Sequence, residues 1–203
     1  MKLFYSNQQG RSMIEMLGVL AIVGVLSVGG IAGYSKAMAN YRINKLIEDY
    51  SFFINGLIAN TDIILKANEY HIAPALSGLG IIPDRWKLKG AIIYDNENRE
   101  LFPFVVDSIT LDYRFKAAKT KNVDKDIQLL CQKLWLNIVK PYADSIYTAA
   151  LFRGETQPSS YYWGSQYCNI SKPCLSILTL PKITELCSSC LEDTRCSIEI
   201  KFK

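Results

Sequence analysis

The residues best suited to chemistry in this chain of 203 residues are six cysteines, all from residue 131 onward: Cys131, Cys168, Cys174, Cys187, Cys190 and Cys196. An even number of cysteines gathered in one region favours disulfide pairs and an extracytoplasmic location for that region. The alternatives are a zinc site built from Cys174, Cys187, Cys190 and Cys196, and redox chemistry at Cys187-Ser-Ser-Cys190. The spacing from Cys174 to Cys187 is irregular for a zinc site. No strand-helix-strand pattern, as a redox motif would have, surrounds Cys187-Ser-Ser-Cys190. The prediction is therefore three structural disulfides.

Other catalytic chemistry has little support in the sequence. His71 is the only histidine, so a two-histidine zinc site is excluded and a histidine-based triad would have to use that residue. No Gly-Lys-Ser/Thr phosphate loop is present. The net charge of +4 comes from 23 basic and 19 acidic residues without a prominent basic cluster, so no nucleic-acid partner is expected. We expect neither enzymatic activity nor a metal or cofactor.

A long apolar segment near the N-terminus gives a more specific signal. The 20 residues 16–35, MLGVLAIVGVLSVGGIAGYS, carry no charge. At about 1.5 Å per residue, such a helix spans roughly 30 Å, the thickness of one hydrocarbon core. A buried helix of a soluble protein is rarely apolar on every face over this length. A secretory signal would end in a small-residue cleavage site, but here the small residue Gly10 precedes the apolar segment. We predict a membrane span at about 14–35.

The residues before this span carry a recognisable motif. Gly10-Arg11-Ser12-Met13-Ile14-Glu15, followed at once by the apolar segment, resembles the type IV prepilin signal of type IV pilins and type II secretion pseudopilins. The resemblance covers residues 1 to about 50. It implies that residues 1–10 are a leader, that a prepilin peptidase cuts between Gly10 and Arg11, that the new N-terminus is methylated, and that Glu15 serves in assembly. Arg11 differs from the apolar residue that usually stands first in this family.

The function implied by the resemblance is a structural subunit of a type IV pilus-like or type II secretion pseudopilus filament. Its partners would be the prepilin peptidase, copies of itself or other pilins, an inner-membrane assembly platform and membrane lipid. Before assembly the chain would lie in the bacterial inner membrane with a periplasmic head, and afterwards in a cell-surface or periplasmic filament. The alternative is a single-span inner-membrane protein whose periplasmic binding domain does not polymerise.

The charge on Glu15 fits more than one role. A carboxylate at the edge of an apolar span is costly unless it is paired or lies among the headgroups. Glu15 is therefore either a glutamate at the membrane boundary or the partner of a neighbouring subunit's α-amine at Arg11. In the second case a misplaced subunit would leave both charges unpaired, which would fix the register of the helices.

The membrane span is expected to continue as one helix over about residues 12–60. Its second half has an apolar stripe with helical spacing: Ile43, Leu46, Ile47, Tyr50, Ile54, Leu57 and Ile58. Five polar residues are expected to face elsewhere: Arg42, Lys45, Glu48, Asp49 and Asn55. This pattern predicts an amphipathic helix that carries a head, with a coiled coil as the alternative. The chain then divides into a leader (1–10), a long helix (11–60) and a globular pilin-like head (61–203).

The head is expected to contain strands at 91–94, 100–106, 108–116 and 196–203 and a helix over about 127–138. Pro103 is expected to place its strand at an edge of the sheet. Cys131 and Cys196 both point inward, which is compatible with one bridge between the helix and the last strand. Pilin-like heads commonly secure their C-terminal segment in this way, but the sequence does not choose among the connectivities. The predicted fold is α+β: a long N-terminal helix packed on a small antiparallel sheet, with a disulfide-linked C-terminal region.

Overall fold

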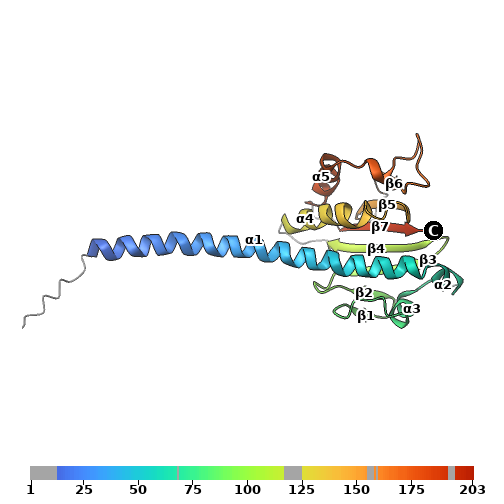
Figure 1. Cartoon of the computed structure of the whole chain (residues 1–203), viewed down its shortest axis with the longest axis horizontal. Coiled ribbons are helices and arrows are strands. Elements are labelled where there is room, and N and C mark those ends of the chain that lie inside the picture. The colour runs from blue at the N-terminus through green and yellow to red at the C-terminus, as the bar shows by residue number, and fades with distance from the viewer. Residues whose placement is uncertain (1–12, 68, 117–124, 155–157, 159, 192–194) are drawn as a thin grey trace, which may run out of the picture. The chain divides into compact units, whose positions relative to one another are not determined.

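The computed structural model describes residues 13–67, 69–116, 125–154, 158, 160–191 and 195–203. The chain divides into two compact units between Arg42 and Ile43. The predicted leader, with Gly10 and Arg11, lies outside the described residues. The first element is helix α1, Met13–Ala59, which is continuous for 47 residues and confirms the single long helix (Figure 1).

The second compact unit, Ile43–Lys203, is the head in the description that follows, and the second half of α1 supplies one side of its core. Five residues of the predicted stripe are buried: Ile43, Leu46, Tyr50, Ile54 and Leu57. Phe53, which the prediction omitted, is also fully buried. The prediction that Asp49 faces away from the core is wrong, since Asp49 is 9% exposed. Its carboxylate has polar partners in the head, which make its burial tolerable.

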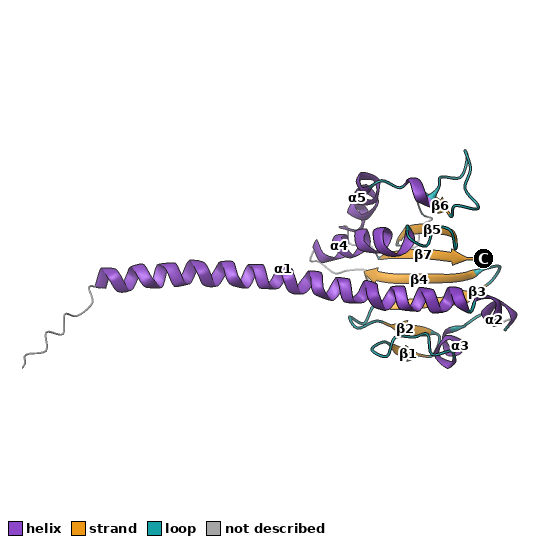
Figure 2. Ribbon diagram, viewed as in Figure 1, coloured by secondary structure: helices purple, strands orange, loops and turns teal. Residues whose placement is uncertain are grey.

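The head is built on one antiparallel sheet of seven strands, in the order β1-β2-β3-β4-β7-β5-β6 (Figure 2). The strands are β1 Lys87–Lys89, β2 Ile92–Tyr94, β3 Glu100–Val105, β4 Ile109–Lys116, β5 Ile146–Arg153, β6 Tyr161–Trp163 and β7 Cys196–Phe202. The C-terminal strand β7 lies between β4 and β5 and pairs with both along nearly its whole length. The last residues of the chain therefore join the two halves of the sheet.

The two central strands agree with the predicted ranges, and one face of each is buried throughout: Ile109, Leu111, Tyr113 and Phe115 of β4, and Cys196, Ile198, Ile200 and Phe202 of β7. On the opposite face, Thr110 and Ser197 are buried as well. The prediction that Pro103 marks an edge strand is wrong, because β3 lies between β2 and β4. The pairs with β2 end at Leu101, so β2 does not reach Pro103 on that side. Proline has no amide hydrogen to donate, but because Pro103 lies outside the paired part of β2 and β3, this absence disrupts no pair between these two strands.

The helices of the head are shorter than α1. They are α2 Thr61–Lys66, α3 Ala73–Gly78, α4 Lys125–Leu134 and α5 Leu180–Ser188. A π-helical turn, Trp135–Val139, continues α4, and 3₁₀ turns cover Leu175–Ile177 and Ser189–Leu191. Side chains of α1, α4 and the π-helical turn meet those of β3, β4 and β7 around a cavity of about 20 Å³. The second half of α1 and α4 therefore cover the same face of the sheet.

One glycine is required by the packing of the backbone. A Cβ at Gly164, just after β6, would overlap the carbonyl oxygen of Ile146 at the start of β5. The Gly164 amide donates a 3.1 Å hydrogen bond to the carbonyl of Tyr147. This close approach holds the segment after β6 against β5 and so positions the cysteine-containing loop that follows.

Candidate functional site

The most unusual surface of the chain is the first part of α1. Twelve large apolar side chains between Met13 and Tyr34 are each at least half exposed: Met13, Met16, Leu17, Val19, Leu20, Ile22, Val23, Val25, Leu26, Val28, Ile31 and Tyr34. They surround the helix, because successive members of the set are one to three residues apart and so fall on every side of it. Among the described residues, this is the one helix long and apolar enough to cross a membrane. Soluble monomers rarely present so continuous an apolar surface to water, so this segment is compatible with a cover of lipid or of other helices.

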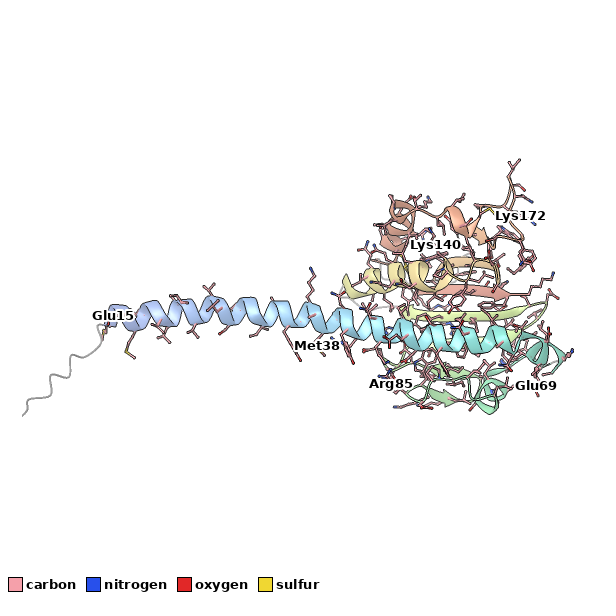
Figure 3. All side chains as sticks on the ribbon, in the orientation of Figure 1. Glu15, Met38, Glu69, Arg85, Lys140 and Lys172 are labelled. Carbon is pink, nitrogen blue, oxygen red and sulfur yellow. A yellow bond between two sulfur atoms is a disulfide. The ribbon has the colours of Figure 1, made fainter. Side chains whose placement is uncertain are left out.

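Glu15 is the only charged residue between Met13 and Ser35. It lies exposed in the first described turn of α1 (Figure 3). The free amide groups at a helix N-terminus favour a carboxylate there. In a covered, apolar environment, however, the carboxylate would need a cationic partner or the headgroup region.

Five glycines of the same segment have no packing role within the described chain. A Cβ added at Gly18, Gly24, Gly29, Gly30 or Gly33 would meet nothing within 4 Å. Gly29 and Gly33 are four residues apart and lie on the same side of the helix. Such a small-xxx-small pair permits a second helix to approach closely in a membrane.

In the head, the second half of α1 is held by a pair of polar contacts. Asp49 accepts hydrogen bonds of 3.3 Å from the Arg85 guanidinium and from Nδ2 of Asn96. Arg85 precedes β1, and Asn96 lies in the turn between β2 and β3. Figure 3 shows Arg85 close to α1. The helix is therefore tied to two loops of the sheet as well as to its apolar face.

The neighbouring residue Asp95 forms a buried polar centre. It is 3% exposed, and its carboxylate accepts hydrogen bonds from Tyr113 Oη at 2.7 Å and from the amides of Glu97 and Arg99 at 2.8 and 2.9 Å. The Arg99 guanidinium lies 3.4 Å from the same carboxylate. Four donors thus compensate the loss of water around a buried charge.

This environment also controls the protonation of two tyrosines. Burial, followed by the charge of Asp95, raises the pKa of Tyr113 well above its ordinary value. Burial and the nearby Tyr113 and Asp95 raise the pKa of Tyr50 in the same way. Burial lowers the pKa of Arg99, but the nearby Tyr113 and Asp95 outweigh it and raise the pKa overall. Tyr113 therefore remains a neutral hydrogen-bond donor to the carboxyl group of Asp95.

All six cysteines are paired, as Cys131–Cys187, Cys168–Cys174 and Cys190–Cys196. The bridge considered between Cys131 and Cys196 is wrong, although both residues are buried as predicted. Helix α5, which the sequence analysis did not predict, packs against α4 and brings Cys187 to Cys131. Cys190 lies just after α5 and reaches Cys196 at the start of β7. The two ends of the Cys-x-x-Cys motif belong to different disulfides, so they form neither the redox pair nor the zinc site considered above.

His71 does not belong to a cluster. It is exposed, pairs with Phe104 through an isolated bridge, and its ring lies 4.6 Å edge-on from that of Tyr70. Within the described part of the chain, no group of three histidine, cysteine, aspartate or glutamate residues could hold a metal ion. The aromatic residues before Cys168 are partly packed: Tyr147 contacts both Trp163 and Tyr167 edge-on at 5.2 and 4.9 Å.

Sequence analysis missed the polar centre at Asp95. One signal was available, because Asp at the start of Asp95-Asn96-Glu97-Asn98 is typical of a turn in which its side chain caps the following amides. The contacts of this turn with Tyr113 and with α1 could not be anticipated, since they depend on how the β2–β3 hairpin packs against β4 and α1.

Comparisons with protein-family models, with curated proteins and with solved structures find no match to this chain. The function of the first part of α1 is therefore inferred from its residues and not from a related protein.

Proposed function

We propose that the chain is a structural subunit of a type IV pilus-like or type II secretion pseudopilus filament. The observation that carries the proposal is the first part of α1, which is apolar and exposed on all sides and contains one carboxylate, Glu15, near its start. A simple membrane anchor needs the apolar surface but does not require a charge at this point, although the headgroups and the helix N-terminus would tolerate one. A helix that exchanges lipid for other helices needs both, because a fixed charge pair can specify how the subunits align.

The sequence before the helix also supports a filament subunit. Cleavage after Gly10 by a prepilin peptidase would create an α-amine at Arg11, four residues before Glu15. In a filament, this amine would pair with Glu15 of an adjacent copy or of another pilin. Gly29 and Gly33 would permit close packing between the same helices.

The proposed route begins in the inner membrane, with the first part of α1 in the lipid and the head in the periplasm. An assembly platform in that membrane would then move the processed subunit into a cell-surface or periplasmic filament. Three disulfides are consistent with folding of the head outside the reducing cytoplasm.

The intact mass of the native chain, extracted from membranes without reductant, tests the proposal. We expect a polypeptide that begins at Arg11, with two hydrogen atoms missing for each of the three disulfides. One further methyl group would agree with methylation of the new N-terminus, and fragmentation of the N-terminal peptide would locate it. A chain that keeps residues 1–10 would overturn the proposal in favour of a single-span membrane protein with a periplasmic binding domain.

A further inference from the structure

The loop closed by Cys168 and Cys174 contains a motif with a chemical meaning of its own. Asn169-Ile170-Ser171 is the only Asn-x-Ser/Thr sequence among the 203 residues. In proteins that leave the cytoplasm, this pattern is the acceptor for sugars attached to the asparagine side chain. Such a short motif occurs often by chance, so its structural setting decides whether it can act.

The setting is the tip of a tight turn. Asn169 and Lys172 exchange two backbone hydrogen bonds of 3.0 Å, and Ile170 between them is 109% exposed. Asn169 and Ser171 are exposed as well. The disulfide closes the base of the turn, with 5.0 Å between the two Cα atoms. An enzyme can therefore reach all three residues of the motif without unfolding the head.

The side chains of the motif are already arranged around the acceptor amide. Oδ1 of Asn169 accepts hydrogen bonds from the Ser171 amide at 3.0 Å and from the Ser171 hydroxyl at 2.8 Å. These bonds fix the orientation of the carboxamide. Among the described residues, none accepts a hydrogen bond from Nδ2 of Asn169, so the nitrogen stays available. The contact of Asn169 with the Ser171 hydroxyl also gives the third position of the motif a physical role.

The base of the loop is supported by aromatic residues. Nζ of Lys172 lies 4.3 Å from the centre of the Trp163 ring (Figure 3 labels Lys172). Tyr167, two residues before Asn169, packs edge-on against Tyr147. These contacts and the disulfide hold the turn in one conformation. Apolar faces of sugar rings also pack well on such aromatic side chains, so a sugar on Asn169 has Tyr167 close by in the sequence.

We propose that Asn169 is a glycosylation site whose donor is a sugar activated by a diphosphate at its anomeric carbon. In this reaction Nδ2 forms a bond to the anomeric carbon, and the bond from that carbon to the diphosphate oxygen breaks. The diphosphate leaves with the electron pair, and the amide nitrogen gives up one proton to the transferring enzyme. The donor is either lipid-linked, which delivers an oligosaccharide, or nucleotide-linked, which delivers a single sugar. The proposal does not depend on polymerisation of the chain.

Mass spectrometry of the full chain from its own cells tests this site. Trypsin releases Asn169 in the peptide 154–182, because the bond between Lys172 and Pro173 resists cleavage, and this peptide contains no other asparagine. We expect it to carry an added mass located at Asn169. An increment of one sugar identifies the nucleotide-linked donor, and a larger increment identifies the lipid-linked donor. An unmodified peptide would overturn the proposal, whatever the N-terminus of the same chain shows.

Two substitutions distinguish loss of the acceptor nitrogen from loss of the folded loop. Asn169→Asp keeps the oxygen that accepts the two Ser171 hydrogen bonds but removes the nucleophilic nitrogen, and we expect complete loss of the added mass. Ser171→Thr keeps a hydroxyl at the third position, and we expect the modification to remain. Retention of all three disulfides verifies folding of each variant. An added mass that persists in Asn169→Asp would place the sugar on another residue and refute the assignment.

Discussion

The Tyr113 hydroxyl donates a 2.7 Å hydrogen bond to the buried carboxylate of Asp95. This bond joins the central strand β4 to the turn between β2 and β3. The ring of Tyr113 also lies 4.6 Å from that of Tyr50 on α1. One residue thus connects the helix, the sheet and a charged turn, while Asn96 in the same turn binds Asp49 of α1. The turn is therefore a structural link between the helix and the sheet.

Loss of the Tyr113 hydroxyl should destabilise the head. Tyr113→Phe keeps the ring contacts but removes one donor from a buried carboxylate, which costs about 1–3 kcal/mol. We expect a lower denaturant midpoint for the full chain in detergent. Tyr70→Phe is a matched control because the Tyr70 side chain is 55% exposed on the head, and we expect a much smaller change. Equal midpoints for wild type and Tyr113→Phe would contradict the role of this hydrogen bond.

The raised pKa values of Tyr113 and Tyr50 predict a loss of stability in alkali. In the unfolded chain both tyrosines ionise near their ordinary value of 10.0, whereas in the folded chain they keep their protons. Above that pH the folded state binds more protons, so the free energy of unfolding falls as the pH rises. Below pH 10 both tyrosines keep their protons in the folded and the unfolded chain, so their contribution to the free energy of unfolding is fully present.

Unfolding of the full chain at a series of pH values from 8 to about 11 measures this effect. Tyr113→Phe removes one of the two ionising groups, so its stability should decline less steeply above pH 10 than that of the wild type. Parallel curves for the two proteins would show that Tyr113 does not contribute to the pH dependence.

Much of the fold could be predicted because its pattern is local. The continuous helix follows from an unbroken apolar segment and an amphipathic stripe, and β4 and β7 follow from alternation. Strand β5 was missed because Ala149, Ala150 and Leu151 are consecutive buried residues that do not alternate. Its neighbour β6 is only three residues long. Both depend on pairing with distant parts of the chain.

The disulfide pattern could likewise be predicted only where it depends on local sequence. Burial of Cys131 and Cys196 follows from their positions in an amphipathic helix and an alternating strand. Their partners do not, because the pairing depends on where α5 packs. Likewise, the position of Glu15 in a helix could be predicted, but the partner that we propose for it belongs to another copy of the chain or to another pilin.

The three disulfides should contribute unequally to stability. The Cys131–Cys187 bridge joins residues 56 positions apart, whereas the Cys168–Cys174 bridge spans only 6. In the chain-entropy model the longer loop is worth about 4 kcal/mol and the shorter about 2 kcal/mol. Replacement of Cys131 and Cys187 by Ala should therefore lower the free energy of unfolding about twice as much as replacement of Cys168 and Cys174. A larger loss from the short loop would refute this order.

Exposure predicts the order of reduction by a thiol. Cys131, Cys187, Cys190 and Cys196 are at most 1% exposed, while Cys168 and Cys174 are partly accessible. Thiolate attack needs access to a sulfur atom, so the Cys168–Cys174 bridge should open first in the folded chain. Brief treatment with dithiothreitol, alkylation and peptide mass spectrometry would identify it. First labelling of a buried pair would contradict the burial seen here.

Substitution of Glu15 tests the assembly role of α1. In the proposed filament, Glu15→Ala leaves the α-amine of a neighbouring subunit without its partner, while the cleavage sequence around Gly10 and Arg11 is unchanged. We expect processing close to that of the wild type but a large loss of sheared filaments. Glu48→Ala is the matched control, because Glu48 is an exposed glutamate on the same helix whose pair with Lys45 lies in the head. It should assemble normally. Filaments at the wild-type level from processed Glu15→Ala would exclude the charge pair and leave Glu15 as a glutamate of the membrane boundary.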